Sequence, residues 1–248
     1  YTLSLHDALP ILIIDLVQKY IAEPFLGLSQ GLGAVLIVTV FVQVFWFFGI
    51  HGPNVLAPVL EGIWGQAQLI NIDIFQKGYN GKTGTPAVLD AIEDGKAYMW
   101  VRGSFDAFAW FGGSGGTIVL LIAILIFSKR ADYLTVAKLS IGPGIFNINE
   151  PVMFGLPIVL NAIMFIPFLI APVVATAIGW TATYLGLVAP VSQQVTWVVP
   201  PFLLSFLATG ADWRAPIVTL VCMVVTFLIW APFVISANKM DPAAGEQQ

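Results

Sequence analysis

Two residues of this sequence are placed to do chemistry on a hydroxyl group, one carboxylate and one imidazole in apolar surroundings. Glu150 lies in the middle of the uncharged stretch 141–161, and the next charged residue after it is Asp212. His51 lies near the end of an aromatic and glycine-containing run, FWFFGIHGPN. An imidazole and a carboxylate at one hydroxyl can donate and accept hydrogen bonds and assist proton removal. The sequence leaves open whether His51 does this or caps a helix end.

The segment around Glu150 is interrupted as well as apolar. It contains prolines at 143, 151 and 157, several glycines, and Asn147 and Asn149 beside the acid. A charged side chain in a membrane costs roughly 2.5–3.5 kcal/mol on insertion scales, so intramembrane acids are functional by default. Broken backbone at membrane depth is tolerated only inside protein or against a water-filled cavity. The pattern predicts a re-entrant hairpin that presents polar groups to a polar ligand; a kinked helix with a paired acid is the alternative.

Two further apolar segments are interrupted by glycine or proline, which is a pointer to a transporter binding site. The first is FGGSGGT, residues 111–117, where Gly113 and Ser114 could approach a ligand or simply allow close helix packing. The second runs over residues 193–214 and holds Trp197, which could stack on a sugar ring or lie in an interfacial belt. Glu61 and Asp106 border apolar segments, where we expect both to be solvated.

The composition excludes several classes of function. Of 248 residues, 58% are hydrophobic and 10% are charged, whereas soluble domains carry about 25% charged residues. The net charge of −4 comes without a long charged block, so nothing indicates nucleic-acid binding. The lone Cys222 excludes a disulfide framework and a CxxC metal site. We therefore expect a membrane protein with no metal and no cofactor of its own.

Uncharged gaps give the membrane organisation, since a spanning helix needs about 20 mostly apolar residues. They predict spans over 32–48, 162–189 and 215–236, and a further uncharged segment over 107–128. Lys129, Arg130 and Lys138 place the end of that last segment on the cytoplasmic side. Residues 71–96 are rich in polar residues and glycine, and are interpreted as a solvent-exposed connection.

The two ends of the chain are interpreted separately from the rest. Residues 1–11 contain TLSLHDALPI, which matches a translated sequencing-adapter oligonucleotide, so we expect them to be an assembly artefact in front of a fragment of a longer protein. Residues 12–26 are amphipathic and predict an interfacial helix. Residues 27–236 form the predicted transport domain, and 237–248 a polar, disordered tail.

Four motifs together resemble a known family. They are WFFGIHG, FGGSGGT, FNINEPVMFGLPIVLN and TGADWRAP, in this order along the chain. They are similar to the membrane component, enzyme IIC, of the bacterial phosphoenolpyruvate:sugar phosphotransferase system, in its lactose, cellobiose and diacetylchitobiose branch. The resemblance covers the chain after residue 11 and corresponds to the C-terminal part of a longer member.

The resemblance implies an all-α polytopic protein of the bacterial inner membrane with two re-entrant hairpins. Such a protein carries a disaccharide by an elevator-like movement, and a phosphocysteine on the cytoplasmic IIB partner, working with IIA, phosphorylates the sugar 6-hydroxyl. It implies that Glu150 and His51 act at that hydroxyl. Asn149 is the adjacent polar position, with Asn147, Trp197 and Arg214 as looser matches. It also implies a homodimer in the full-length protein, in contact with lipid.

Two rival classes remain. In a proton-coupled secondary transporter Glu150 would bind the proton and no partner protein would be needed. An intramembrane hydrolase is disfavoured because the sequence has neither HExxH nor GxSxG. If both groups serve one hydroxyl, His51 and Glu150 should share a cavity, whereas the alternative pairs Glu150 with a cation such as Arg214. Which disaccharide is carried does not follow from the sequence.

Overall fold

The computed structural model describes residues 23–239, and this part of the chain is helical, with one isolated antiparallel bridge between Tyr79 and Lys82. The predicted all-α class is confirmed. The elements are α2 (Glu23–Leu28), α3 (Leu32–Phe47), α4 (Gly52–Val55), α5 (Ala57–Val59), the π-helix η2 (Leu60–Gly65), α6 (Gln66–Lys77), α7 (Thr85–Glu93), α8 (Arg102–Phe108), α9 (Thr117–Phe127), α10 (Ala131–Ile145), α11 (Glu150–Gly155), α12 (Ala162–Tyr184), α13 (Pro201–Ala208) and α14 (Arg214–Ala237).

Two of the described helices, α12 and α14, are long and apolar enough to cross a membrane. At 1.5 Å per residue, helices of 23 and 24 residues reach about 35 Å. They pack against each other, and α3 and α9 pack against them in turn. The predicted spans over 162–189 and 215–236 are therefore helices, although α12 ends at Tyr184. The 32–48 segment is the helix α3, which has 16 residues.

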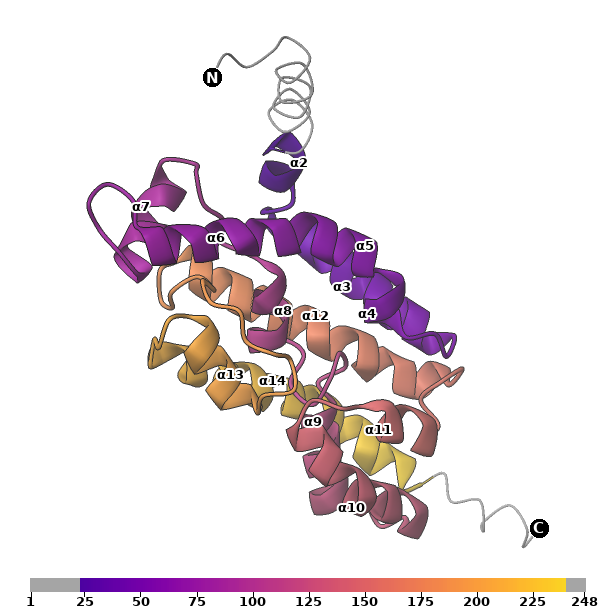
Figure 1. Ribbon diagram of the computed structural model, residues 1–248. Helices are drawn as coiled ribbons and strands as arrows, with labels where there is room; N and C mark the ends of the chain where they lie inside the picture. The colour runs from indigo at the N-terminus through magenta and orange to yellow at the C-terminus, as the bar shows by residue number, and fades with distance from the viewer. Residues whose placement is uncertain (1–22, 240–248) are drawn as a thin grey trace, which may run out of the picture.

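The uncharged segment 107–128 is divided rather than continuous. Residues 109–116 form a glycine turn, and α9 has only 11 residues, about 16 Å of helix, which is shorter than a bilayer core of about 30 Å. The physical reason is conformational: Gly112, Gly113 and Gly116 all have positive φ angles, which a continuing right-handed helix excludes. The break brings the turn into the interior of the molecule, beside α8 (Figure 1).

Helix α8 lies at the centre of the bundle, in contact with η2, α6, α12, α13 and α14 (Figure 1). Its core is aromatic. The ring of Phe105 packs edge-on against Trp64 and Trp100 and stacks on Trp110, with centroid distances of 5.5, 5.4 and 5.4 Å. Large rigid rings fix the position of this short helix, whose own seven residues would be marginal as an isolated helix.

The 71–96 segment is more ordered than a solvent-exposed connection. The structure places Asn71–Lys77 in α6 and Thr85–Glu93 in α7, and only the turns beside them are irregular. Val88 and Ala91 on one face of α7 are buried in a small cluster of their own with Ala97. Most of the segment is exposed or half-buried, as predicted, but its helices were not expected. Glycine and asparagine mark only the turn at 78–84, while α7 has Pro86 in its first turn and one apolar face.

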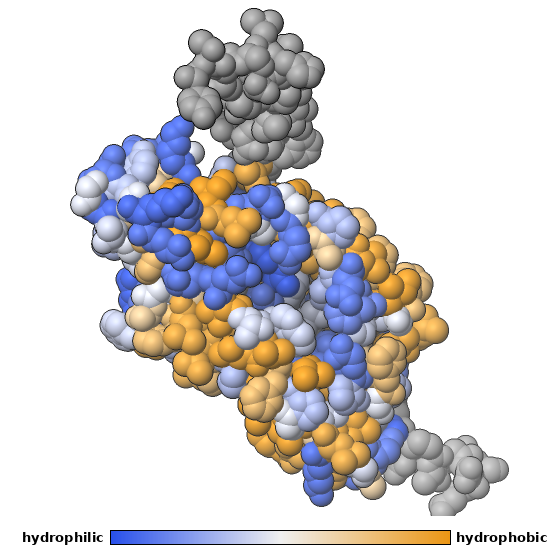
Figure 2. All heavy atoms as spheres, viewed as in Figure 1, coloured by the Kyte–Doolittle hydropathy of each residue, from blue (hydrophilic) through white to orange (hydrophobic). Residues whose placement is uncertain are grey.

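The surface of the two long helices is apolar. Exposed side chains include Ile163, Ile166 and Ile170 on α12, and Leu220, Val224 and Leu228 on α14. Figure 2 shows broad hydrophobic areas, with hydrophilic residues gathered over α6 and α7 and in a band across the middle of the same face. An apolar surface of this extent suits contact with lipid or another apolar partner.

The structure describes only part of the segments predicted at the chain ends. Residues 1–22, with the predicted artefact and most of the predicted interfacial helix, lie outside the described residues, as do residues 240–248. Within the described part, Glu23–Leu28 is helical. Asn238 donates to the Phe127 carbonyl at 2.9 Å and accepts from the Lys129 amide at 2.8 Å, so the end of α14 is tied to the end of α9.

Candidate functional site

A cavity of about 270 Å³ collects polar side chains from four separate parts of the chain. The contributing segments are the α3–α4 junction, α8 with the glycine turn that follows it, the α10–α11 junction, and the irregular segment before α13. The lining residues are His51, Pro53, Asn54, Arg102, Asp106, Trp110, Gly113, Ser114, Asn147, Asn149, Glu150 and Trp197. Seven of the eight residues predicted for the site line this cavity.

His51 and Glu150 face each other in this cavity, with Nε2 of the imidazole 3.5 Å from Oε1 of the carboxylate. The Nδ1 atom of His51 accepts a hydrogen bond from the Asn54 amide at 3.3 Å and so caps the N-terminus of α4. His51 therefore caps a helix and faces Glu150 at the same time. Because Nδ1 acts as an acceptor, the neutral ring carries its proton on Nε2, the nitrogen that faces Glu150. The prediction of a shared cavity is confirmed.

Glu150 is placed by a break in the backbone. α10 contains Pro143 and ends at Ile145, Asn147 has a φ of 62°, and α11 begins at Glu150 with Pro151 behind it. Proline suits the first turn of a helix, where its missing N–H has no partner to lose. The predicted interruption around Glu150 is thus present, and it turns the carboxylate toward His51 instead of along a helix surface.

Asn147 and Asn149 differ in what their amides do. The Asn147 side chain accepts from the Gly112 amide at 2.7 Å and donates to the carbonyls of Trp197 and Val199 at 2.6 and 2.9 Å. Nδ2 of Asn149 is buried and has no hydrogen-bond partner within the described chain. A buried donor without a partner is costly, so a ligand acceptor at this point would relieve it. Asn149 is the amide free to bind, and Asn147 is engaged in the protein.

The glycine turn lines the cavity at one position and allows close packing at another. Gly113 lines the cavity with a φ of 100°, and a Cβ there would lie 2.6 Å from Cβ of Asn149. Gly115 serves packing, since a Cβ there would lie 2.1 Å from the Phe168 ring. Ser114 is held from α3, because Trp46 Nε1 donates to its hydroxyl at 2.7 Å and Gln43 donates to its carbonyl.

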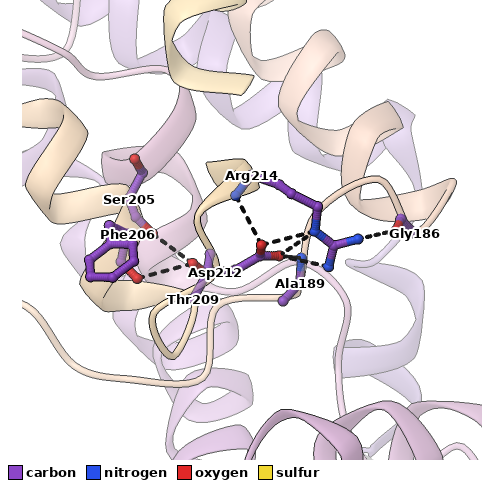
Figure 3. Close-up of polar contacts among 7 residues, drawn as sticks. All are labelled: Gly186, Ala189, Ser205, Phe206, Thr209, Asp212 and Arg214. Atoms are coloured by element: carbon purple, nitrogen blue, oxygen red, sulfur yellow. Dashed lines mark hydrogen bonds and ion pairs between the residues drawn. The ribbon is translucent and has the colours of Figure 1, made fainter. Parts of the chain in front are cut away.

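Arg214, which was predicted as a binding residue, is not among the residues that line this cavity. Its guanidinium pairs with Asp212 at 2.8 Å and reaches the Gly186 carbonyl at 3.4 Å, as Figure 3 shows. Asp212 also accepts from the Ala189 amide at 2.8 Å. Burial raises the pKa of the Asp212 carboxyl, but the hydrogen bonds from Arg214 and Ala189 outweigh it, and the pKa lies below its usual range. The pair joins the turn before α14 to the segment after α12. The alternative in which Arg214 pairs with Glu150 is therefore not what the structure shows.

A charged cluster on α8 was missed by the sequence analysis. Arg102 donates to Asp106 at 2.7 Å and to Glu61 at 3.0 Å, and its guanidinium lies 4.9 Å from the centre of the Trp110 ring. Asp106 was expected to be solvated, yet its side chain is only 13% exposed, since it lies in the cavity wall against Arg102. Glu61 is exposed, as expected. The i,i+4 spacing of Arg102 and Asp106, in a region with few other charges, was the sequence signal that could have indicated this ion pair.

Two helices long and apolar enough to cross a membrane, together with a cavity lined by polar side chains, indicate a membrane transport protein as the class. The comparisons are more specific. The family model described as "Phosphotransferase system, EIIC" matches residues 8–172. The chain therefore belongs to the EIIC family, whose members are integral membrane components of sugar phosphotransferase systems.

Individual relatives agree with this assignment. The chain is 57% identical over 235 residues to the cellobiose-specific EIIC component of Lactococcus lactis, covering 92% of this chain and 48% of that protein. It is 34% identical to the oligo-beta-mannoside-specific EIIC component of Bacillus subtilis, covering 94% and 50%. The crystal structure of the transporter ChbC, the IIC component from the N,N'-diacetylchitobiose-specific phosphotransferase system, matches with a TM-score of 0.82 and 32% identity, over 94% of this chain and 51% of that one. The chain spans about half the length of these relatives.

Proposed function

We propose that this chain is the sugar-binding part of a permease component of the phosphoenolpyruvate-dependent phosphotransferase system. It moves a disaccharide of the cellobiose, diacetylchitobiose or lactose type across the bacterial inner membrane, with phosphorylation of the sugar 6-hydroxyl by IIB. The observation that carries the proposal is the approach of His51 to Glu150 in a polar cavity. The family membership and the relatives named above support the choice of substrate class.

In this proposal the 6-hydroxyl lies between the two side chains. His51 Nε2–H donates to the hydroxyl oxygen, and Glu150 accepts its proton, so the oxygen becomes a better nucleophile. The oxygen attacks phosphorus on the phosphocysteine of IIB; the P–O bond forms as the P–S bond breaks, and the thiolate leaves. IIA then recharges IIB. The contribution of this chain is the orientation of the hydroxyl and the removal of its proton, which lowers the barrier through positioning.

The remaining cavity residues bind the rest of the sugar. Trp197 is 50% exposed and lines the cavity, so its ring face is available to the apolar side of a pyranose. The free amide of Asn149 donates to a hydroxyl, and Gly113 and Ser114 allow a close backbone approach. A few well-placed polar groups around an aromatic face are typical of small-molecule sites. The charged wall formed by Arg102 and Asp106 adds further hydrogen-bonding groups.

The membrane arrangement also belongs to the proposal. We infer that 141–161 forms a re-entrant hairpin, supported by the break between α10 and α11, and that a second hairpin accompanies it, as the family resemblance implies. The cavity then travels with these elements in an elevator-like movement. Lipid covers the apolar faces of α12 and α14, and the full-length protein forms a homodimer.

The test is sugar uptake in membrane vesicles that contain the protein, with and without IIB, IIA and phosphoenolpyruvate. The proposal expects a 6-phosphorylated disaccharide inside the vesicles only when phospho-IIB is supplied. Uptake of unmodified sugar driven by a proton gradient, with no partner present, would instead identify a proton-coupled secondary transporter. Competition among β-linked disaccharides in the same vesicles determines which sugar is preferred.

A further inference from the structure

The side chain of Asn147 uses all its hydrogen-bonding capacity on backbone groups from two other segments. Its Oδ1 accepts from Gly112, and the two hydrogens of Nδ2 are directed to the carbonyls of Trp197 and Val199. The residue is 7% exposed and has a φ of 62°, a conformation in which asparagine is enriched. A neutral amide has one acceptor group and two donor hydrogens, so it is satisfied here without any ligand.

The segment that carries Trp197 packs on the core through Val195 and Val199 and has few hydrogen bonds to the rest of the described chain. Between Tyr184 and Pro201 the chain has no helix or strand. Near its start, the amides of Ser192 and Gln193 donate to the Ala208 carbonyl at 2.9 and 3.0 Å, and Gln68 donates to the Gln193 carbonyl at 3.2 Å. Residues 194–199 make two hydrogen bonds to the rest of the described chain, and both are donated by Asn147.

The other contact of Asn147 reaches the glycine turn. Gly112 has a φ of 77°, and a Cβ at this position would lie 2.2 Å from the Ile118 amide, so the turn has little freedom of its own. Asn147 therefore ties a rigid turn, next to Gly113, to the irregular segment that holds Trp197. Asn149 and Glu150 follow Asn147 two and three positions later in the sequence. One amide thus sets the distance between three walls of the cavity.

We propose that Asn147 is a positioning residue that fixes Trp197 against the cavity and acts on sugar binding only through that ring. Its part in sugar affinity rests on the proposed function; its part in holding the segment does not. Asparagine was predicted as a sugar ligand, and the geometry points to this other role. Aspartate has almost the same shape and keeps the acceptor for Gly112, but it turns an oxygen toward two carbonyl oxygens, so it releases the Trp197 segment selectively.

The first test measures release of the segment without any sugar. Val195 is partly buried against the core two positions before Trp197, and the single cysteine, Cys222, is buried, so Val195→Cys provides one labelling site that is shielded while the segment is held. In the full chain in detergent, Asn147→Asp should raise the rate of maleimide labelling at this site by about tenfold, the factor expected for roughly one lost hydrogen bond. Asn161→Asp is the matched control, because Asn161 uses only its Oδ1, as the cap of α12. An unchanged rate in Asn147→Asp, or an equal rise in Asn161→Asp, overturns the proposal.

The second test measures disaccharide binding in a double-mutant cycle. Asn147→Asp should weaken binding by about tenfold alone, and should have little further effect when Trp197 is already replaced by alanine, since coupled residues are non-additive. Additive losses contradict a role through Trp197. If the wild-type chain binds no disaccharide but Asn147→Asp still accelerates labelling, the proposed function fails and the tie to the segment stands.

Discussion

Nε2 of His51 and Oε1 of Glu150 lie 3.5 Å apart, although a turn, several helices and the basic cluster after α9 separate the two residues along the chain. This distance is longer than the usual 2.7–3.2 Å of a direct N–H···O hydrogen bond. The pair is therefore close enough to bind one hydroxyl between them, and its own mutual contact is weak. Since His51 is anchored through Nδ1 and Glu150 by the start of α11, neither side chain depends on the other for its place.

The first prediction separates sugar binding from phosphorylation. Glu150→Gln keeps the shape and one carbonyl oxygen, so disaccharide affinity should change by less than roughly tenfold, or about 1.4 kcal/mol. The amide cannot take the hydroxyl proton, so phosphorylation by phospho-IIB should fall severely. Binding is measured by calorimetry and phosphorylation in vesicles supplied with phospho-IIB. Normal phosphorylation in the variant would exclude Glu150 as the proton acceptor.

The second prediction concerns the charged wall on α8. Arg102→Met leaves Asp106 largely buried without its partner, which should destabilise the protein by about 3 kcal/mol, the lower end for a broken buried pair because both side chains retain some exposure. The double variant Arg102→Met, Asp106→Leu should recover most of that loss. Both are measured by denaturant unfolding in detergent. If the single and double variants are equally unstable, packing against Trp110 and not charge explains the loss.

The third prediction follows from the position of Arg214 outside the cavity. Arg214→Ala should leave disaccharide affinity unchanged, because the guanidinium contacts Asp212 and Gly186 and no cavity residue. The protein should lose about 1 kcal/mol of stability, since a partly exposed pair contributes little and Asp212 keeps its bond from Ala189. A marked loss of affinity at unchanged stability would return Arg214 to the binding site.

The fourth prediction is a pH dependence at the same pair. The pKa of Asp212 is lower in the folded chain than in the unfolded one, where it is about 3.9. Its contribution to stability is therefore fully present above pH of about 4 and is lost as the pH falls through the folded pKa. Asp212→Asn should lower stability at neutral pH and reduce its acid-side decline, followed by unfolding at several pH values. Asp73→Asn is the control, because the exposed Asp73–Lys77 pair should contribute little to stability at neutral pH.

Local patterns in the sequence predicted those features that are determined by neighbouring residues in the chain, and they missed those that depend on contacts between distant segments. The apolar composition of 162–184 and 214–237 is local, so both long helices were predicted. The break at Glu150 was also local, since prolines and glycines cause it. The burial of Asp106 was not local, because it depends on the cavity wall and on Arg102, whose guanidinium lies over Trp110. The approach of His51 to Glu150 was expected chiefly because the motifs resembled a family. The same resemblance gave Arg214, whose position away from the cavity, paired with Asp212, depends on the turn at 186–189 and has no local signal.

The last prediction tests the close approach of the glycine turn to Asn149. Gly113→Ala places a Cβ 2.6 Å from Cβ of Asn149 and requires alanine at a φ of 100°, so either the turn or Asn149 must move. Because Asn149 precedes Glu150, disaccharide affinity should fall by tenfold or more, about 1.4 kcal/mol. Gly33→Ala in α3 is the matched control: nothing lies within 4 Å of its Cβ, and alanine in a helix should stabilise the chain by roughly 0.5–1 kcal/mol. Calorimetric titration of both variants decides the matter. Equal affinities for the two would show that the turn yields freely and that Gly113 has no part in shaping the site.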